Sequence, residues 1–393
     1  MFESLQPMPA DAILGLIVEH RNDPRPEKID LGVGVYRDAS GQTPVPDTVK
    51  QAEKRLLATQ SSKAYIGTAG DALFNASMQA LTFDAAAPDD RLITIQTPGG
   101  SGSLRVAAGI VLRAKENPTV WVSTPTWANH EPLLGGAGMT LKEYPYYDRH
   151  GHVIQIDAML ETLRAAPKGD LVLFHACCHN PSGLDPSVEQ WRAITDVLLE
   201  RELVPFIDLA YQGFAKNLDD DAFAIRHMAS HLPEMIVTSS CSKNFGLYRD
   251  RVGTLSVLVA SAATVPILAS QLSHYVRTLY SMPPDHGAAI VSIILNDDDL
   301  RAQWIGEVSE MRDRIHDMRA LLSDALKAKA PDHDFSHLLR ANGMFCFLGV
   351  TAEQVARLKK DYGIYMVDSS RINVAGITAE NVDYLASSIA AVL

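Results

Sequence analysis

The chain has 393 residues, of which 47% are hydrophobic and 21% charged, an ordinary composition for a globular protein of about two domains. Its formal net charge is -12, which argues against nucleic acid and anionic membranes as partners, because both bind clustered Lys and Arg. A local cationic pocket for a small anion remains compatible with this charge.

The cysteines and the start of the chain bear on where the protein works. Cys177, Cys178, Cys241 and Cys346 show no repeated spacing typical of a disulfide framework, which indicates a reducing compartment. The opening residues MFESLQPMPADAIL lack the basic segment and apolar core of a signal peptide. No run of about 18 apolar residues occurs, so we expect no membrane span. We therefore expect a cytoplasmic enzyme.

In chain order, the sequence first predicts a helix at 11–23 and a strand-like segment at 28–36. Apolar segments then predict strands at 91–97, 119–124, 141–147, 170–177, 203–210, 235–240 and 252–260. Several are continuous runs of Val, Ile, Leu and Phe, which is typical of strands buried on both faces. Helices are predicted between them at 103–115, 157–166 and 186–202. The last begins after Asp185 with Pro186 in its first turn.

This alternation of strands and helices predicts an α/β fold with a mainly parallel sheet covered by helices, whose ligands bind at the strand ends. After about residue 300 the pattern changes to a long helix at 301–329, followed by short apolar segments and two more helices. We predict three parts: an N-terminal arm (1–12), a smaller α+β domain (13–45 and 311–393) and a large domain (46–310).

The predicted strand at 91–97 leads into a glycine-rich turn at 99–102 that opens the next helix. Backbone N–H groups in such a turn can hold an anion, and the helix dipole favours negative charge there. A dinucleotide fingerprint would expect an acid after the following strand, but that strand ends in Ser123 and Thr124. The turn therefore favours a cofactor with a single phosphate, and the alternative is a tight turn without a ligand.

Polar and aromatic residues follow other predicted strands. Asp208 ends an apolar strand, and Tyr211 comes three residues later. This carboxylate could be a helix cap or an ion-pair partner, or it could hold a cationic ring nitrogen, because a buried carboxylate needs a positive partner. Trp127 stands among polar residues in a turn, where a flat ligand could stack on it, whereas His130 is more often expected at the surface.

The segment HACCHNPSG (175–183) offers four soft ligands and therefore allows a zinc site. We disfavour zinc and expect no metal, because Cys177 and Cys178 are adjacent on a strand and point to opposite faces. Asn180 stands at the strand's end, where a polar side chain can meet a ligand. The alternative is a simple Asn-Pro turn.

Lys243 ends the run MIVTSSCSK, flanked by Ser242 and close to Arg251. A desolvated amine near a cation has its charged form disfavoured, which is what a lysine needs to form a Schiff base. The alternative is a lysine hydrogen-bonded to loop carbonyls. Near the C-terminus, Arg371 lies in a short polar turn, and it is either an ordinary surface arginine or a bidentate carboxylate ligand.

Taken together, the chain resembles the aspartate and aromatic amino-acid aminotransferases, which are pyridoxal-phosphate (PLP) enzymes of fold type I. The matching motifs occur in the family's order: GGSGSLR, PTWANH, CCHNPSG, FIDLAYQGF, SSCSKNFGLYRDRVG and SSRINVAG. The likeness extends from LGVGVYRD to NVAGI, nearly the whole chain. It implies a large PLP-binding domain with a seven-stranded sheet, and transamination in two half-reactions.

The resemblance also implies roles for residues around the cofactor. Lys243 would form the Schiff base with PLP and move the substrate proton, and Asp208 would pair with the ring nitrogen. Around the ring it implies Tyr211 and Asn180 at the phenolic oxygen, Trp127 stacked on the ring, and His130 supporting Asp208. For the phosphate it implies Gly100, Ser101, Ser240, Ser242 and Arg251. For the substrate α-carboxylate it implies Arg371, with the Gly34 backbone nearby.

Two residues are implied to act in the neighbouring subunit of an obligate homodimer. Tyr65 would reach the partner's phosphate, and Arg277 would pair with the side-chain carboxylate of aspartate or glutamate. Ser101, Ala64 and Met282 depart from strict aspartate enzymes, and small or apolar residues there lower the cost of burying an aromatic side chain. We therefore expect transamination of aromatic and acidic amino acids with 2-oxoglutarate as acceptor. The runner-up is an aspartate aminotransferase with minor aromatic activity, and a β-eliminase or decarboxylase on the same fold stays open.

Overall fold

The computed structural model describes residues 1–7 and 12–393. Two units emerge, one made of Met1–Thr43 with Arg314–Leu393 and the other of Pro44–Asp313. Part of the predicted arm, residues 8–11, lies outside the described residues, and the roles of the domains stay a prediction. Among the described residues, no helix is both long and apolar enough to cross a membrane.

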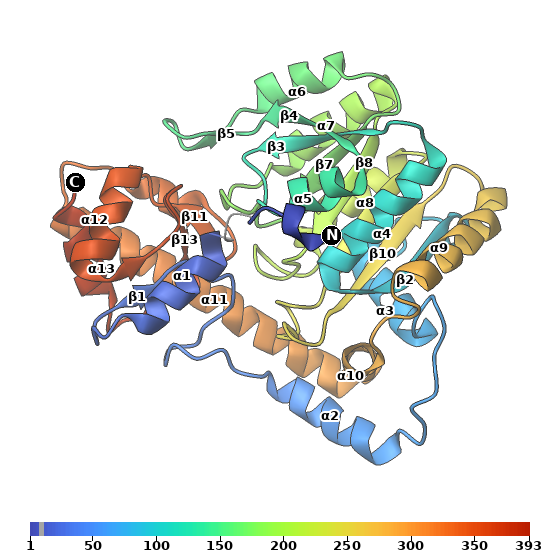
Figure 1. Cartoon of the computed structure of the whole chain (residues 1–393), viewed down its shortest axis with the longest axis horizontal. Coiled ribbons are helices and arrows are strands. Elements are labelled where there is room, and N and C mark those ends of the chain that lie inside the picture. The colour runs from blue at the N-terminus through green and yellow to red at the C-terminus, as the bar shows by residue number, and fades with distance from the viewer. Residues whose placement is uncertain (8–11) are drawn as a thin grey trace. The chain divides into compact units, whose positions relative to one another are not determined.

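The larger unit is built on one seven-stranded sheet (Figure 1). Its spatial order is β2 (Leu92–Pro98), β10 (Val252–Leu258), β9 (Met235–Ser240), β8 (Val204–Leu209), β7 (Leu171–His175), β3 (Thr119–Thr124) and β4 (Thr140–Pro145). Within this sheet β10 runs antiparallel to β2 and β9, and the other neighbouring pairs are parallel. The prediction of a mainly parallel α/β sheet is confirmed.

The strand bounds follow the apolar runs, with two differences. Every residue of β7 and β9 is buried, as expected for strands covered on both faces. The segment predicted as one strand at 141–147 is divided, because β5 (Tyr147–Asp148) leaves the sheet to pair with β6 (Val153–Ile154). The strand predicted at 170–177 ends earlier, and the backbone then turns at Cys178, where φ is +52°.

Helices cover this sheet, among them α3 (Ala72–Phe83), α4 (Gly99–Ala114), α5 (His130–Leu134), α6 (Ile156–Ala165), α7 (Val188–Arg201), α8 (Phe223–His231), α9 (Val265–Leu279) and α10 (Asp285–Leu295). The helix α2 (Asp47–Thr59) packs on α10. Leu104 of α4 and Leu272 of α9 share one apolar core with Leu173 and Phe206 of the sheet. Figure 1 shows α4 beside β10 and α9 near β2, and the two helices contact each other. The long helix predicted from 301 begins earlier, as α11 (Asp298–Lys329).

Two helix starts differ from prediction. The glycine-rich segment was expected as a turn before a helix at Ser103, but α4 begins at Gly99, so the glycines form its first turn. Pro186 was expected inside a first turn, but it precedes the N-cap of α7. That cap is Ser187, which forms a capping box with Gln190. The Ser187 side chain accepts from the Gln190 N–H and the Gln190 side chain accepts from the Ser187 N–H, whereas a proline side chain has no acceptor for them.

The smaller unit combines short strands with helices. β1 (Ile29–Asp30) pairs in parallel with β12 (Ile364–Tyr365), and β11 (Phe345–Phe347) pairs antiparallel with β13 (Arg371–Asn373). Its helices include α1 (Ala12–Asn22), α12 (Ala352–Tyr362) and α13 (Val382–Ala390). Arg371 therefore opens a buried strand, whereas the sequence placed it in a polar turn.

Candidate functional site

Lys243 lies just past the end of β9, in the larger unit. Its Nζ is 4.8 Å from the centre of the Tyr211 ring, and its side chain makes no hydrogen bond to any described residue. Burial lowers the pKa of Lys243 to about 8, with a further contribution from Arg251 and an opposing one from Asp208. A substantial fraction of this amine is therefore uncharged near neutral pH, and the alternative of a lysine bonded to loop carbonyls is wrong.

The turn that carries Lys243 is held from several sides. The Gly246 N–H donates to the Lys243 carbonyl at 3.0 Å, and Gly246 has a φ of +65° that favours glycine. Asn244 donates from Nδ2 to the Gln212 carbonyl at 3.3 Å, which links this turn to the loop after Tyr211. These contacts fix the backbone from which the Lys243 side chain extends.

Asp208, at the end of β8, faces His130 at the start of α5. His130 Nε2 is 3.1 Å from Asp208 Oδ2, and its Nδ1 is 2.8 Å from Thr126 Oγ1. Burial alone would raise the pKa of Asp208, but the hydrogen bond from His130 and nearby positive charge outweigh it, so the pKa is lowered. The expectation of a surface histidine is wrong, because His130 is 0% exposed and both ring nitrogens are engaged.

Two further buried histidines continue this chain of contacts, and the sequence analysis did not single them out. His175 is the register partner of Asp208 in β7, and its Nε2 is 3.3 Å from Thr126 Oγ1. His179 lies between Ser123 and Ser182, at 2.9 and 2.8 Å. Burial lowers the pKa of His175 to about 3. In the sequence, the two histidines stand four residues apart in HACCHNPSG, and we considered them there only as zinc ligands.

The segment after β7 also corrects the zinc argument. Cys177 and Cys178 are not on a strand, because β7 ends at His175. Among the described residues, no group of three or more His, Cys, Asp and Glu could hold a metal ion. Asn180 is buried, and its Oδ1 lacks a hydrogen-bond partner within the described part of the chain. Such an atom is available to a bound polar group.

Trp127 stands beside the Asp208–His130 pair. Its ring centre is 5.2 Å from that of His130, with the planes at 87°, and the side chain is half-buried. In an edge-to-face contact of this kind one ring presents its edge to a face of the other, so at least one face of the Trp127 ring is not used by His130.

A corner suited to an anion, called the anion corner below, forms where β2 meets α4. Gly99 has a φ of +70°, and a Cβ added there would lie 2.6 Å from Arg251 Nη2, so the guanidinium closes on the glycine backbone. Arg251 Nη1 donates to Ser242 Oγ at 3.4 Å, and the Ser242 N–H donates to Ser240 Oγ at 3.2 Å. The first turn of α4 also contains the other two residues predicted for a phosphate, Gly100 and Ser101. N–H groups, hydroxyls and a fixed cation suit an anion.

Tyr65 and Arg277 lie apart from these residues. Tyr65 is 92% exposed, in the loop between α2 and α3. Arg277 lies in the last turn of α9, exposed, and donates from Nη1 to Ser281 Oγ at 2.5 Å.

Gly34 and Arg371 belong to the smaller unit, where both contact Phe345. The Arg371 guanidinium lies 4.4 Å from the Phe345 ring centre and donates from Nη2 to the Gly32 carbonyl at 2.7 Å. A Cβ at Gly34 would come within 3.1 Å of Phe345 Cζ. The structure thus brings these two predicted substrate residues to one aromatic ring.

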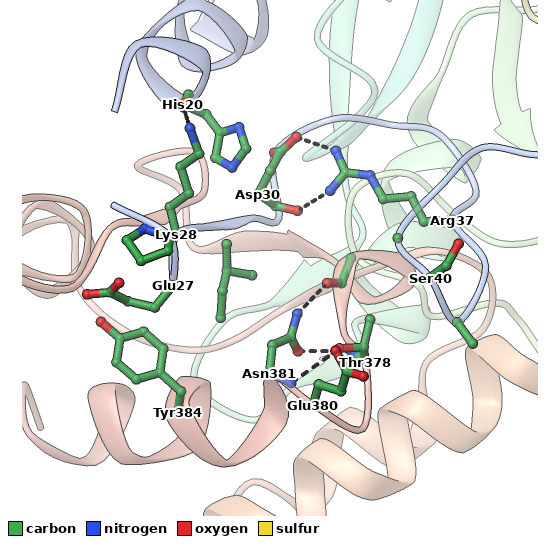
Figure 2. A pocket seen from close by; sticks show the side chains of 15 residues that line it. His20, Glu27, Lys28, Asp30, Arg37, Ser40, Thr378, Glu380, Asn381 and Tyr384 are labelled. Atoms are coloured by element: carbon green, nitrogen blue, oxygen red, sulfur yellow. Dashed lines mark hydrogen bonds and ion pairs between the residues drawn. The ribbon is translucent and has the colours of Figure 1, made fainter. Parts of the chain in front are cut away.

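The smaller unit also contains a cavity of about 640 Å³ (Figure 2). None of the predicted site residues lines it. Both cations that line it are engaged, since Arg37 pairs with Asp30 at 2.5 Å and Lys28 Nζ donates to the carbonyls of His20 and Asp23. Because the amine of lowered pKa and the predicted site residues lie elsewhere, we place the candidate site at the strand ends of the larger unit.

Comparisons with known proteins agree with this geometry. The family model "Aminotransferase class I and II" matches residues 26–389. The aspartate aminotransferase of Escherichia coli is 46% identical over 396 residues, covering 100% of both chains. The aromatic-amino-acid aminotransferase of Pseudomonas aeruginosa is 47% identical over 394 residues, covering 100% of this chain and 98% of its own. The crystal structure of a Burkholderia pseudomallei aromatic-amino-acid aminotransferase covalently bound to pyridoxal phosphate superposes with a TM-score of 0.98 and 41% identity, over 100% of this chain and 99% of that one.

Proposed function

The chain belongs to the class I and II aminotransferases, and we propose that it uses PLP to transaminate both aromatic and acidic amino acids, with 2-oxoglutarate as acceptor. The observation that carries this proposal is the Lys243 amine, which is desolvated, makes no hydrogen bond to residues 1–7 or 12–393, and lies near an ionised Asp208. A cytoplasmic location and a homodimeric state are part of the same proposal.

Three features of the described residues fit PLP. Lys243 supplies an amine of lowered pKa, the form that a Schiff base requires. The corner of Gly99 and Arg251 is built for an anion such as a phosphate. Asn180 offers a buried amide with an unpaired oxygen, and an amide can present either its oxygen or its NH₂ group.

When bound, PLP supplies the electron sink for the reaction, and the protein supplies binding, orientation and proton transfer. We propose that Lys243 moves the proton at the substrate α-carbon, which its lowered pKa permits. Asp208, kept ionised by His130, holds the ring nitrogen in its protonated form. The remaining proposed contacts are Tyr211 and Asn180 at the ring's phenolic oxygen, Trp127 on the ring face, and Gly100, Ser101, Ser240, Ser242, Arg251 and the neighbouring subunit's Tyr65 at the phosphate.

For the substrate, we assign Arg371 to the α-carboxylate, with the Gly34 backbone beside it, and Arg277 to the second carboxylate of a dicarboxylic substrate. The exposure of Tyr65 and Arg277 in the single chain supports their acting in the neighbouring subunit of a homodimer. A guanidinium suits this task because it binds a carboxylate through two parallel hydrogen bonds.

The proposed dual specificity rests on Ala64, Ser101 and Met282, where no large polar group has to lose its water when an aromatic side chain is buried. The runner-up, an aspartate aminotransferase with minor aromatic activity, keeps the same machinery. Relatives with both names match this chain equally well, so substrate preference has to be measured.

The test is an absorbance titration of the purified protein saturated with PLP and free of keto acid. We expect phenylalanine and aspartate each to convert the near-visible cofactor band. Conversion by aspartate alone would select the runner-up. After unbound PLP is removed, the Lys243→Ala variant should fold but hold no PLP as a Schiff base, and so lack that band, whereas Lys115→Ala, which alters a lysine bonded to the Gly169 carbonyl, should retain it. A normal band and full turnover in Lys243→Ala would refute the proposed mechanism.

A further inference from the structure

Two carboxylates outside the proposed site close the loops that carry Tyr211 and Asn180. Asp221 is 4% exposed, and it accepts three backbone hydrogen bonds from the loop after Tyr211. Gly213 N and Ala215 N donate to its Oδ2 at 2.8 and 2.9 Å, and Lys216 N donates to its Oδ1 at 2.9 Å. A carboxylate that gathers three N–H groups of one loop fixes that loop's backbone.

Asp185 does the same for the segment that contains Asn180. Its Oδ2 accepts from Cys178 N and its Oδ1 from His179 N, both at 2.9 Å. Cys178 has a φ of +52°, so the chain reverses there in a conformation that a non-glycine residue adopts only when it is held. The Gly183 N–H then donates to the His179 carbonyl at 2.7 Å, which closes the loop around Asn180.

The charge of Asp185 acts on Asp221, and the Tyr211 loop is joined to the Lys243 turn. Burial raises the pKa of Asp221 to about 6 against its three hydrogen bonds, and the nearby charge of Asp185 adds to the increase. The Tyr211 loop is also tied to the Lys243 turn through the bond from Asn244 to the Gln212 carbonyl. Burial disfavours the ionised form of Asp221, and its three backbone hydrogen bonds act in the opposite direction, so the carboxylate is committed to this loop.

We infer that Asp221 and Asp185 are positioning residues, which hold Tyr211 and Asn180 where both hydrogen-bond the phenolic oxygen of the proposed cofactor. The inference rests on the proposed function. Neither carboxylate touches the cofactor in this assignment, and each acts through backbone N–H groups. Hydrogen bonds donated to the phenolic oxygen favour its ionised form, so a loosened loop raises the pH at which the cofactor's absorbance band titrates.

The test compares Asp221→Asn and Asp185→Asn with Asp170→Asn. In each, the amide replaces one acceptor oxygen with an NH₂ group, so at least one donor loses its partner. Asp170 is the matched control, because it is buried in the same unit and accepts from Trp121 Nε1 at 3.0 Å, but stands before the start of β7, at the strand's opposite end. The primary readout is the pH midpoint of the absorbance band of bound PLP. The second is hydrogen exchange of the 213–216 amides in cofactor-free protein.

We expect Asp221→Asn and Asp185→Asn to raise the midpoint by about one pH unit, the size of one lost hydrogen bond to a charged group, and Asp170→Asn to leave it unchanged. Exchange at 213–216 should accelerate in Asp221→Asn alone. The inference is overturned if Asp221→Asn and Asp185→Asn fold, lose as much thermal stability as Asp170→Asn, and still show an unchanged pH midpoint. The two carboxylates would then serve only the stability of the fold. If Asp221→Asn does not fold, the Asp185→Asn midpoint decides. A wild-type protein with no PLP band would instead mean that the proposed function has failed, and the inference with it.

Discussion

The Trp304 indole N–H donates to the Asn244 carbonyl at 2.7 Å, so a residue of α11 holds the backbone next to Lys243. The indole is 0% exposed and stacks on Phe245, with ring centres 4.4 Å apart and planes at 8°. One side chain from 60 residues away thereby fixes two consecutive residues of the turn that carries the proposed catalytic amine.

Replacing Trp304 should therefore affect both stability and the turn. We expect Trp304→Ala to lower the free energy of unfolding by about 3–5 kcal/mol, because it leaves a cavity in the core and an unbonded carbonyl. Trp304→Phe keeps most of the volume and should cost less. Denaturant unfolding measures the loss, and hydrogen exchange at Phe245 and Gly246 reports the loosened turn. An exchange rate unchanged in Trp304→Ala would contradict this coupling.

The lowered pKa of Lys243 predicts unusual reactivity in cofactor-free protein. With a pKa of about 8, about a quarter of the amine is uncharged at pH 7.5, against about a thousandth for an ordinary lysine. Competitive acetylation read by peptide mass spectrometry should show Lys243 labelling rise and level off above about pH 8, with exposed Lys54 as the internal reference.

Asp208 opposes the depression of this pKa, so the Asp208→Asn variant should move the Lys243 labelling midpoint to lower pH. A shift in the opposite direction would mean that Asp208 does not act on the amine through its charge.

His175 predicts part of the acid sensitivity of the fold. Its pKa falls from 6.5 to about 3 on folding, chiefly through burial, with a smaller contribution from His130. A neutral buried histidine contributes stability above about pH 6.5, and this is lost progressively as the pH falls toward 3, up to roughly 5 kcal/mol. His175→Asn should flatten the stability profile over that range. Equal slopes for both proteins in urea unfolding between pH 6.5 and 4 would exclude this contribution.

Gly99 predicts a specific sensitivity at the anion corner. Gly99→Ala should lower the free energy of unfolding by about 1–2 kcal/mol, because a residue with a Cβ is strained at a φ of +70°. The new Cβ would also push the Arg251 guanidinium aside. The measurement is calorimetric binding of inorganic phosphate and PLP, both of which should weaken. Gly136→Ala is the matched control, since nothing lies within 4 Å of its added Cβ and its φ is not positive. Equal affinities in the two variants would contradict an anion site at Gly99.

Much of the fold could be predicted because the strands are written as local apolar runs. The β9 run MIVTSS, for example, is buried at every position. Strand direction cannot be predicted from these runs, because an apolar strand can pair in either direction. Only the structure showed that β10 runs antiparallel to its neighbours. The helix start at Gly99 was missed because glycine has a poor helix propensity.

The proposed site residues came from resemblance, while their supports depend on contacts distant in sequence. His130 was expected at the surface because its partner Asp208 is 78 residues away. Asp221 stands in the run DDD at 219–221, which indicates a solvated loop, yet it is the one of the three that is buried. Residues that hold a site are harder to predict than those that form it, since local sequence carries no record of which backbone they bind.

The strand order of the sheet has a consequence for how the protein matures. Gly99 follows β2, Arg251 precedes β10, Ser240 ends β9 and Asp208 lies in β8, and these four strands are neighbours in the sheet. A growing chain therefore cannot assemble the anion corner until synthesis has passed Arg251 and β10 has been inserted between β2 and β9. Pairing strands so far apart in the sequence is slow, and a phosphate-bearing cofactor can bind and stabilise only the finished arrangement. Bound at 100 times its dissociation constant, it would favour the native state by about 2.7 kcal/mol, so cellular cofactor supply would set how much of the newly made chain persists.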